Sequence, residues 1–276
     1  MIFSHFKRRR GIRFDDGFRH SARELALYPL VATYDAILAT DPTVPVLLQL
    51  TEYRGQQVLW QDPACTVPVE EIGDPIGGVR HPETGEILAV QETDANRPVW
   101  GGREVGAEFD ESALDSATDD PFVTPGIDAS YFALALDIPS DLNDNDQFVS
   151  QQNPDGPTHQ FRWRNTGTYN SQIMCWNGAE RATSDAPDFE GEASVALYRK
   201  DDGLRRSASY RSDGSVRGEA SSNTDLDIAD GPRTGIGYRI DNDDRYIRMN
   251  LRAAVFWDVA TDEIEDATVP HLMRLL

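Results

Sequence analysis

Acidic residues are the first candidates for chemistry in this sequence. Glu108 and Asp110 are two residues apart, and alternate residues of an extended strand face the same side. Retaining glycoside hydrolysis needs two carboxyls about 5 Å apart. Glu263 and Glu265 have the same spacing, but they fall in a predicted helix, where such positions do not face each other. A hydrolytic role therefore requires Glu108 and Asp110 to line a groove with a third acid.

Two polar loops carry clustered carboxylates, which are hard oxygen ligands of the kind that calcium prefers. Neither loop has the full EF-hand spacing, and runs of Asp and Asn also form ordinary turns. We predict no cofactor and keep a bound calcium ion as the alternative. The residues concerned are Asp141, Asp144, Asp146, Asp241, Asp243 and Asp244.

Three aromatic residues lie in or between neighbouring predicted strands and could form a platform for a glycan: Trp163, Tyr169 and Trp176. Sugars stack on such rings when polar side chains lie nearby. The alternative is that the rings pack in the core or between subunits. The five histidines are scattered without the spacing of a zinc site, and no motif indicates a catalytic serine.

Charge divides the chain into two parts. Residues 1–23 contain seven basic and two acidic residues, a formal charge of +5, whereas the whole chain of 276 residues carries −21. The acidic main body repels phosphates, so we predict that it binds no nucleic acid. No apolar run approaches the roughly 20 residues that span a bilayer, and we predict no membrane insertion.

The basic segment opens an N-terminal arm, residues 1–44, that we interpret as an attachment segment. Its phenylalanines favour docking over a purely solvated tail, which is the alternative. The residues expected to attach are Phe3, Phe6, Lys7, Arg8, Arg9, Arg10, Phe14 and Phe18. The only cysteines, Cys65 and Cys175, are too few for a disulfide framework. We favour two free buried thiols, and a disulfide bond between the two cysteines is the alternative.

The elements that would position these residues are strands. Short extended pieces punctuated by Pro and Gly run from about residue 58 to 110. From residue 130 onward, strands recur every ten to fifteen residues, with Asp213-Gly214 as a hairpin turn. A helix capped by Thr261 closes the sequence. This pattern predicts an all-β, two-sheet antiparallel sandwich.

Two passages carry a resemblance to a known family. The C-terminal one reads Gly235-Ile-Gly-Tyr-Arg239, then Ala253-Ala-Val-Phe-Trp257 and a Thr-Asp-Glu-Ile-Glu helix. The front passage contains Leu59-Trp-Gln-Asp-Pro63, Gly73-Asp-Pro75, Asn96-Arg-Pro98 and Glu108-Phe-Asp110. Together they resemble the concanavalin A-like (laminin-G-like) jelly-roll domain found in tailed-phage and prophage structural proteins.

The resemblance implies a concanavalin A-like sandwich over residues 45–276, in a non-enzymatic fibre, spike or decoration subunit of a virion. Its partners would be capsid or tail proteins, sister copies in a homo-oligomer, and polysaccharide on the host surface, with assembly in the host cytoplasm. Hydrolytic members of the fold carry a Glu-x-Asp-x-x-Glu strand, which this sequence lacks. A carbohydrate-active hydrolase or lyase on the same sandwich is the alternative, and a free cellular lectin-like module is another.

Overall fold

The computed structural model describes residues 31–32, 34–39, 46–48, 50–117, 130–138, 147–152, 159–164, 172–176, 181–185, 191–201, 204–222, 233–238, 246–257 and 261–276. Within these residues the chain forms two large antiparallel sheets, one two-stranded hairpin and few helices.

The first sheet has eight strands. Its order is β17 (Val216–Ser222), β16 (Leu204–Arg211), β15 (Ser194–Asp201), β10 (Ser130–Asp137), β19 (Met249–Trp257), β8 (Ala107–Phe109) and β7 (Val99–Trp100), and β1 (Val46–Leu48) also pairs with β19.

The second sheet has nine strands. Its order is β14 (Arg181–Asp185), β13 (Gln172–Trp176), β12 (His159–Arg164), β11 (Gln147–Gln152), β18 (Arg233–Ile236), β9 (Leu114–Ser116), β6 (Ile87–Val90), β5 (Gly78–Arg80) and β4 (Leu59–Trp60). The separate hairpin joins β2 (Glu52–Tyr53) to β3 (Gln56–Gln57), and η2 (Asp94–Asn96) is a short 3-10 turn.

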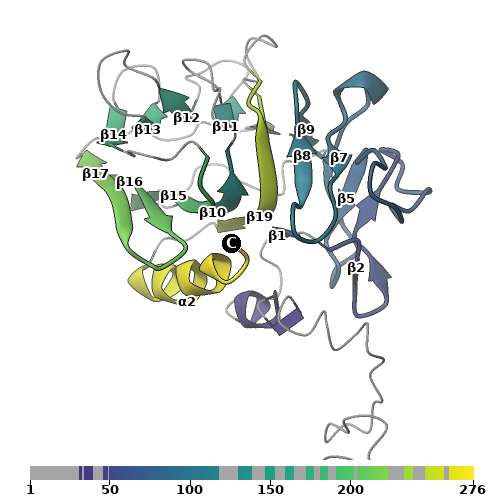
Figure 1. Ribbon diagram of the computed structural model, residues 1–276, viewed down its shortest axis with the longest axis horizontal. Helices are drawn as coiled ribbons and strands as arrows, with labels where there is room; N and C mark the ends of the chain where they lie inside the picture. Colours follow the sequence, from purple (N-terminus) through teal and green to yellow (C-terminus); the bar gives the residue numbers. More distant parts are fainter. Residues whose placement is uncertain are drawn as a thin grey trace, which may run out of the picture.

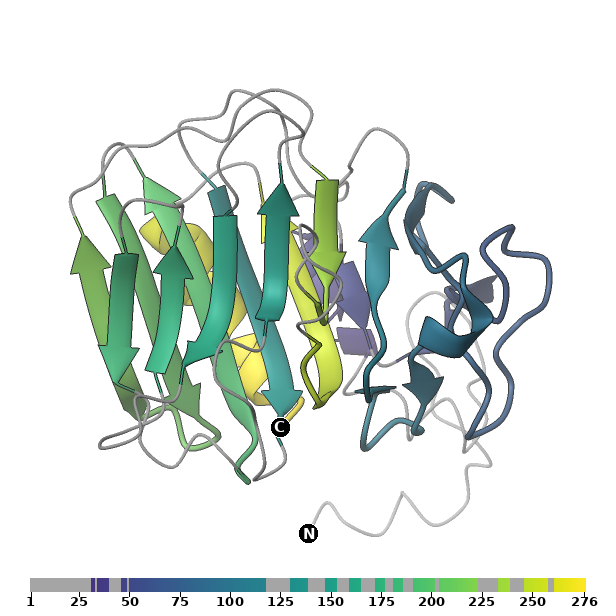
Figure 2. The same ribbon diagram turned by 90° about the horizontal axis from the view of Figure 1, so that it is seen from above.

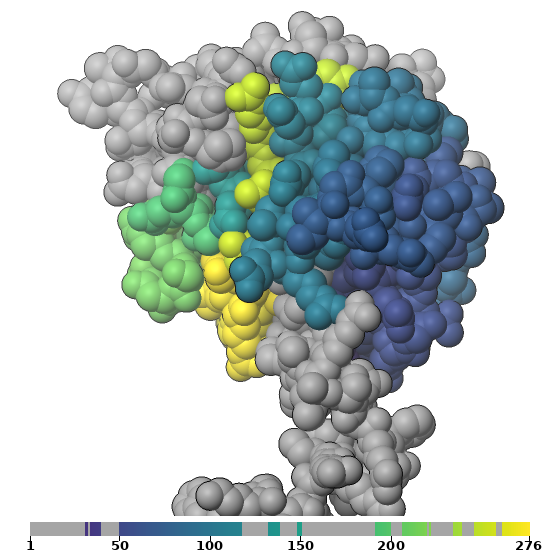
Figure 3. All heavy atoms as spheres, turned by 45° about the vertical axis from the view of Figure 1, so that its right-hand side comes forward, coloured from purple at the N-terminus to yellow at the C-terminus, as the bar shows by residue number. Residues whose placement is uncertain are grey.

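The two sheets stack face to face, and helix α2 (Asp262–Met273) covers the outer side of the eight-stranded sheet (Figure 1). Strand β10 is therefore covered on both sides, and its residues 132–136 are all buried. This explains why its sequence is a continuous apolar run instead of an alternating one. Figure 2 shows the strands side by side, with residues 50–117 extending both sheets at one end, and Figure 3 shows the same residues (blue to teal) together on one side of the molecule. The predicted all-β, two-sheet antiparallel sandwich with a short C-terminal helix is confirmed.

Helix α2 is fixed to the sheet by its acidic first turn. The Thr261 hydroxyl caps it by accepting from the Ile264 amide. Glu265, only 8% exposed, accepts hydrogen bonds from the Arg206 guanidinium and, at 2.9 Å, from the Tyr210 hydroxyl. Burial and then the charge of Glu265 raise the pKa of Tyr210 to about 12. The helix is thus docked by buried charge pairs as well as by apolar contacts.

Near the N-terminal end, residues 31–32 and 34–38 are helical. Tyr34, Ile37 and Leu38 are buried in the same hydrophobic core as the sandwich. Asp35 accepts hydrogen bonds from Tyr53 and Arg54 of the β2–β3 hairpin. This part of the predicted arm therefore packs on the domain, while Phe3 to Phe18 lie outside the described residues.

The predictions on the two cysteines and on membrane-spanning helices can be compared with the described residues. Cys65 is a free, buried thiol, as predicted, and burial raises its pKa. Cys175 occupies β13, but its side chain is not among those described. Among the described helices, none combines the length and apolar character of a membrane span.

Candidate active site

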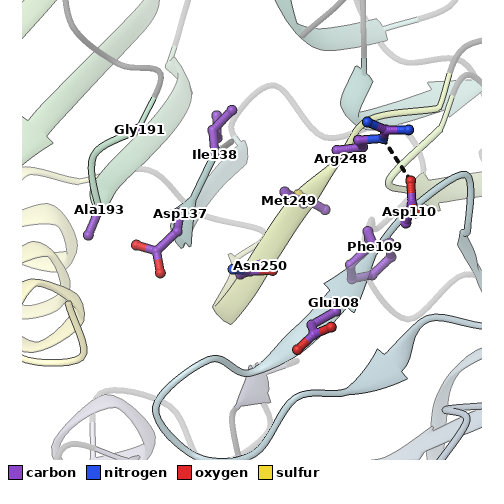
Figure 4. Close-up of a pocket in the computed structure, with 10 residues that line it drawn as sticks. All are labelled: Glu108, Phe109, Asp110, Asp137, Ile138, Gly191, Ala193, Arg248, Met249 and Asn250. Carbon is purple, nitrogen blue, oxygen red and sulfur yellow. Dashed lines mark hydrogen bonds and ion pairs between the residues drawn. The ribbon is translucent and has the colours of Figure 1, made fainter. Parts of the chain in front are cut away.

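A pocket of about 550 Å³ lies where one end of the eight-stranded sheet meets the segment before β15. Strand β8 ends there, β19 begins there, and β10 ends there. Ten residues line it, as Figure 4 shows: Glu108, Phe109, Asp110, Asp137, Ile138, Gly191, Ala193, Arg248, Met249 and Asn250.

Strand register places three of the polar residues in one row. Asn250 of β19 is opposite Glu108 of β8 on one side and opposite Asp137 of β10 on the other. Registered partners share a face of the sheet, and Figure 4 shows the three side chains in succession across the strands. Because neighbouring strands are about 4.8 Å apart, the Cα atoms of Glu108 and Asp137 are roughly 10 Å apart. The row therefore places one carboxyl on each side of the Asn250 amide.

Asp137 is held by Arg252, which lies two residues beyond Asn250 on the same face of β19. Arg252 Nη2 and Nε donate to Oδ2 of Asp137 at 2.5 and 3.2 Å. Arg252 Nη1 also donates to the carbonyls of Leu275 and Leu276, at 2.7 and 2.8 Å. The row of Glu108, Asn250 and Asp137 therefore lies on the α2 side of the sheet, and within the described residues Arg252 contacts only Oδ2 of Asp137.

Glu108 is exposed and has no hydrogen-bond or ion-pair partner within the described part of the chain. Its carboxylate lies against Gly101, where a Cβ would collide with Oε1 of Glu108. Glycine at position 101 thus leaves space for this carboxylate beside β7. Among the residues that the structure describes, Glu108 is the only acid of the pocket without a cationic partner.

Asp110, the remaining acid of the pocket, forms an ion pair with Arg248, just beyond the registered pair of Phe109 and Met249. Arg248 Nε donates to Oδ1 of Asp110 at 2.7 Å, and both side chains are largely exposed. The remaining walls are apolar, since Phe109, Ile138 and Met249 are buried at the same strand ends. An apolar floor with a few polar groups at the rim is the usual form of a small-molecule site.

Sequence reasoning identified Glu108 and Asp110 but missed Asp137, Asn250 and Arg248. Asp137 and Asn250 join the site through cross-strand pairing between segments more than 100 residues apart. The one sequence signal for Asp137 is its position, because it is the charged residue directly after the apolar run of β10. In the described residues, no group of three His, Cys, Asp or Glu side chains is arranged to hold a metal ion.

The other predicted site residues are only partly covered. Trp163 is opposite Ile173, and Trp176 is opposite Gln160, so these two positions are on opposite faces of their sheet. One platform can therefore include at most one of them. Their side chains, Tyr169 and all six calcium candidates (Asp141, Asp144, Asp146, Asp241, Asp243 and Asp244) lie outside what the structure describes, and these assignments stay predictions.

Comparison with known proteins gives structural relatives alone, since no family model and no curated protein match the sequence. An arabinofuranosidase complexed with arabinofuranosyl-α-1,2-xylobiose superposes with a TM-score of 0.55 at 12% identity, covering 73% of this chain and 51% of that one. An α-L-arabinofuranosidase soaked with a cyclic sulfate inhibitor gives 0.51 at 13%, with the same coverage.

The Trypanosoma rangeli sialidase, in complex with a difluorinated nononic acid, gives a TM-score of 0.51 at 11% identity. The match covers 90% of this chain and 39% of the sialidase. This chain thus spans about half the length of the arabinofuranosidases and less of the sialidase. At such identities the likeness establishes the β-sandwich fold.

These findings correct the prediction of a non-enzymatic phage particle subunit. The three structures described above are glycosidases, and none of these three is a phage protein. The third acid that a hydrolytic role required is present as Asp137, in one pocket with Glu108 and Asp110. The virion location, the capsid or tail partners, the homo-oligomer and the host polysaccharide stay predictions.

Proposed function

We propose that this protein is a glycoside hydrolase and that the pocket at the ends of β8, β10 and β19 is its active site. The observation that carries the proposal is the registered row of Glu108, Asn250 and Asp137. Glycoside hydrolysis uses a pair of carboxyl groups on either side of the scissile bond. The likeness in fold to glycosidases supports the same class of reaction.

The separation of the two carboxyls favours inversion at the anomeric carbon. Inverting enzymes keep their carboxyls about 6.5–9.5 Å apart, which leaves room for a water molecule. Side chains from positions roughly 10 Å apart on one face can reach that separation. Retaining enzymes need about 5 Å, which would require the two side chains to lean toward each other.

In the proposed reaction, Glu108 is the general acid and gives its proton to the glycosidic oxygen as the bond from that oxygen to the anomeric carbon breaks. Asp137 is the general base and takes a proton from water through Oδ1, while the water oxygen bonds to the anomeric carbon. Asn250, between them, offers an amide that can hydrogen-bond a sugar hydroxyl. The products are a free sugar and the protonated leaving group.

The test is hydrolysis of a panel of 4-nitrophenyl glycosides and of xylan and arabinan by the purified chain. We expect Glu108→Gln and Asp137→Asn each to lower kcat by about 100-fold or more, since general acid–base catalysis contributes that much. Glu86→Gln is the matched control, because Glu86 is an exposed acid away from the pocket.

Substrate affinity should survive in both pocket variants, measured by calorimetry with the substrate that the wild type cleaves. Full activity in both variants would refute the assigned pair. Absence of hydrolysis by the wild type across the panel, with sugar binding retained, would instead favour a lectin-like module.

A further inference from the structure

Arg252 stands beside the proposed base at an irregularity in the sheet. The register shifts between Ala135 and Leu136 of β10, whose partners in β19 are two residues apart, so Arg252 is an extra residue at a β-bulge. Such a residue has no partner across the ladder, and bulges next to active sites redirect a side chain. Here the side chain is a guanidinium, and it reaches Asp137.

The guanidinium uses all three of its nitrogens. Nη2 and Nε donate to one oxygen of Asp137, Oδ2, at 2.5 and 3.2 Å. Nη1 donates to the carbonyls of Leu275 and Leu276 at 2.7 and 2.8 Å. These carbonyls belong to the turn after α2, which is anchored by the buried side chain of Leu275. Arg252 therefore cannot follow a movement of Asp137 without breaking its bonds to this turn.

An aspartate that acts as a base needs such a support. The last torsion of its side chain is broad and roughly two-fold, so the side chain alone does not determine which oxygen faces a water molecule. A carboxylate offers about two acceptor sites on each oxygen, and Arg252 fills two sites on Oδ2 of Asp137. Within the described residues, Oδ1 accepts no hydrogen bond. The contact thus distinguishes the two oxygens.

We propose that Arg252 is a positioning residue for the hydrolysis: it fixes Oδ2 of Asp137 and so presents Oδ1 to the attacking water. The inference rests on the proposed function and deepens it by naming the group that orients the base. A misplacement of about 1 Å can cost about 100-fold in rate. Arg252 is not among the residues that line the pocket, so its loss should reduce kcat and leave substrate affinity unchanged.

The experiment measures kcat and KM of two variants on the glycoside that the wild type cleaves best. Arg252→Ala should lower kcat about 100-fold while KM stays close to the wild-type value. Arg252→Lys should have an intermediate kcat, because an ammonium keeps the charge but not the forked geometry.

Millimolar guanidinium chloride adds a readout that a purely structural role would not move. It should raise the kcat of Arg252→Ala, because the free ion can take the place of the missing group beside Asp137. Equal concentrations of sodium chloride or urea should not raise it. Guanidinium weakens folded proteins, so a variant that was inactive only through lost stability would gain nothing. Arg54→Ala is the control: it removes an exposed guanidinium outside the pocket, and its kcat should equal that of the wild type and show no response.

Two results would overturn the inference: a wild-type kcat in Arg252→Lys, or an Arg252→Ala variant that is folded by circular dichroism and gains nothing from guanidinium. In either case the hydrolase assignment stands if Asp137→Asn is inactive. If Arg252→Ala does not fold, the kcat of Arg252→Lys decides the question. If the wild type cleaves no glycoside, the proposed function fails and the inference fails with it.

Discussion

At the scale of single residues, Arg252 connects the proposed base to the end of the domain. It binds Asp137 and the carbonyls of Leu275 and Leu276 with the same guanidinium, which is only 15% exposed. Removing this side chain leaves a half-buried carboxylate and two carbonyl groups without their donor. Each such loss costs about 1–3 kcal/mol.

We therefore expect Arg252→Ala to lower the free energy of unfolding by about 3 kcal/mol or more, measured by urea denaturation. Arg252→Lys should recover part of the loss, because an ammonium replaces the charge but not the forked geometry. Arg54→Ala is the control, since the Arg54–Asp35 pair is exposed and such pairs contribute about 0–1 kcal/mol. Equal effects of the two alanine variants would contradict the bridging role.

Residue-scale prediction from sequence identified two of the five charged or amide residues that line the pocket. Glu108 and Asp110 stand two apart in one segment, so their shared face could be read from the chain. Asp137 and Asn250 could not be placed beside them, because register between distant strands depends on tertiary packing and on the bulge between Ala135 and Leu136. The phage interpretation came from local sequence similarity, which does not determine function on a widely used fold.

At the scale of elements, helix α2 depends on one buried carboxylate. The Glu265 carboxylate accepts hydrogen bonds from Arg206 and Tyr210, and Arg199 Nη1 lies 3.5 Å from its Oε2. Glu265→Ala should destabilise the protein by about 3 kcal/mol, because Arg206 and Arg199 would keep only the more exposed carboxylates of Glu219 and Asp262 as counter-charges. Differential scanning calorimetry would measure the effect.

Asp266→Ala is the matched control in the same helix, since Asp266 is exposed and its loss should change stability by no more than about 0.5 kcal/mol. If Glu265→Ala melts at the wild-type temperature, the ion-pair cluster does not hold α2 on the sheet.

Elements with strong periodic signals were predictable. The apolar run of β10, the hairpin between β16 and β17 and the Thr261 cap all follow from local chemistry. Strand β14 was missed because its sequence, Arg-Ala-Thr-Ser-Asp, has no apolar alternation. The short strands from β4 to β9 appear in sequence as short extended pieces between turns, and only the completed sheets show that they extend the same sandwich.

At the scale of the whole molecule, the net charge of −21 opposes the compact state through self-repulsion. Salt shortens the range of this repulsion to about 8–10 Å at physiological strength. We expect the Tm to rise by several degrees when sodium chloride is raised from about 0.02 M to about 0.3 M. Choline chloride should raise the Tm by the same amount as sodium chloride. An equal rise would show that the salt acts by screening charge and not by binding of a particular cation. A Tm that falls with salt would show that attractive ion pairs outweigh the repulsion.

The strand order of the eight-stranded sheet also has a consequence for how the protein is made. β19 is the last strand in the sequence, yet it lies between β10 and β8 and also pairs with β1. During synthesis, residues 50–117 and residues 130–222 leave the ribosome before the strand that joins their parts of this sheet. Until β19 inserts, β8 and β10 present open edges, which are sites for pairing with other chains. Closure of this sheet therefore waits for the synthesis of β19.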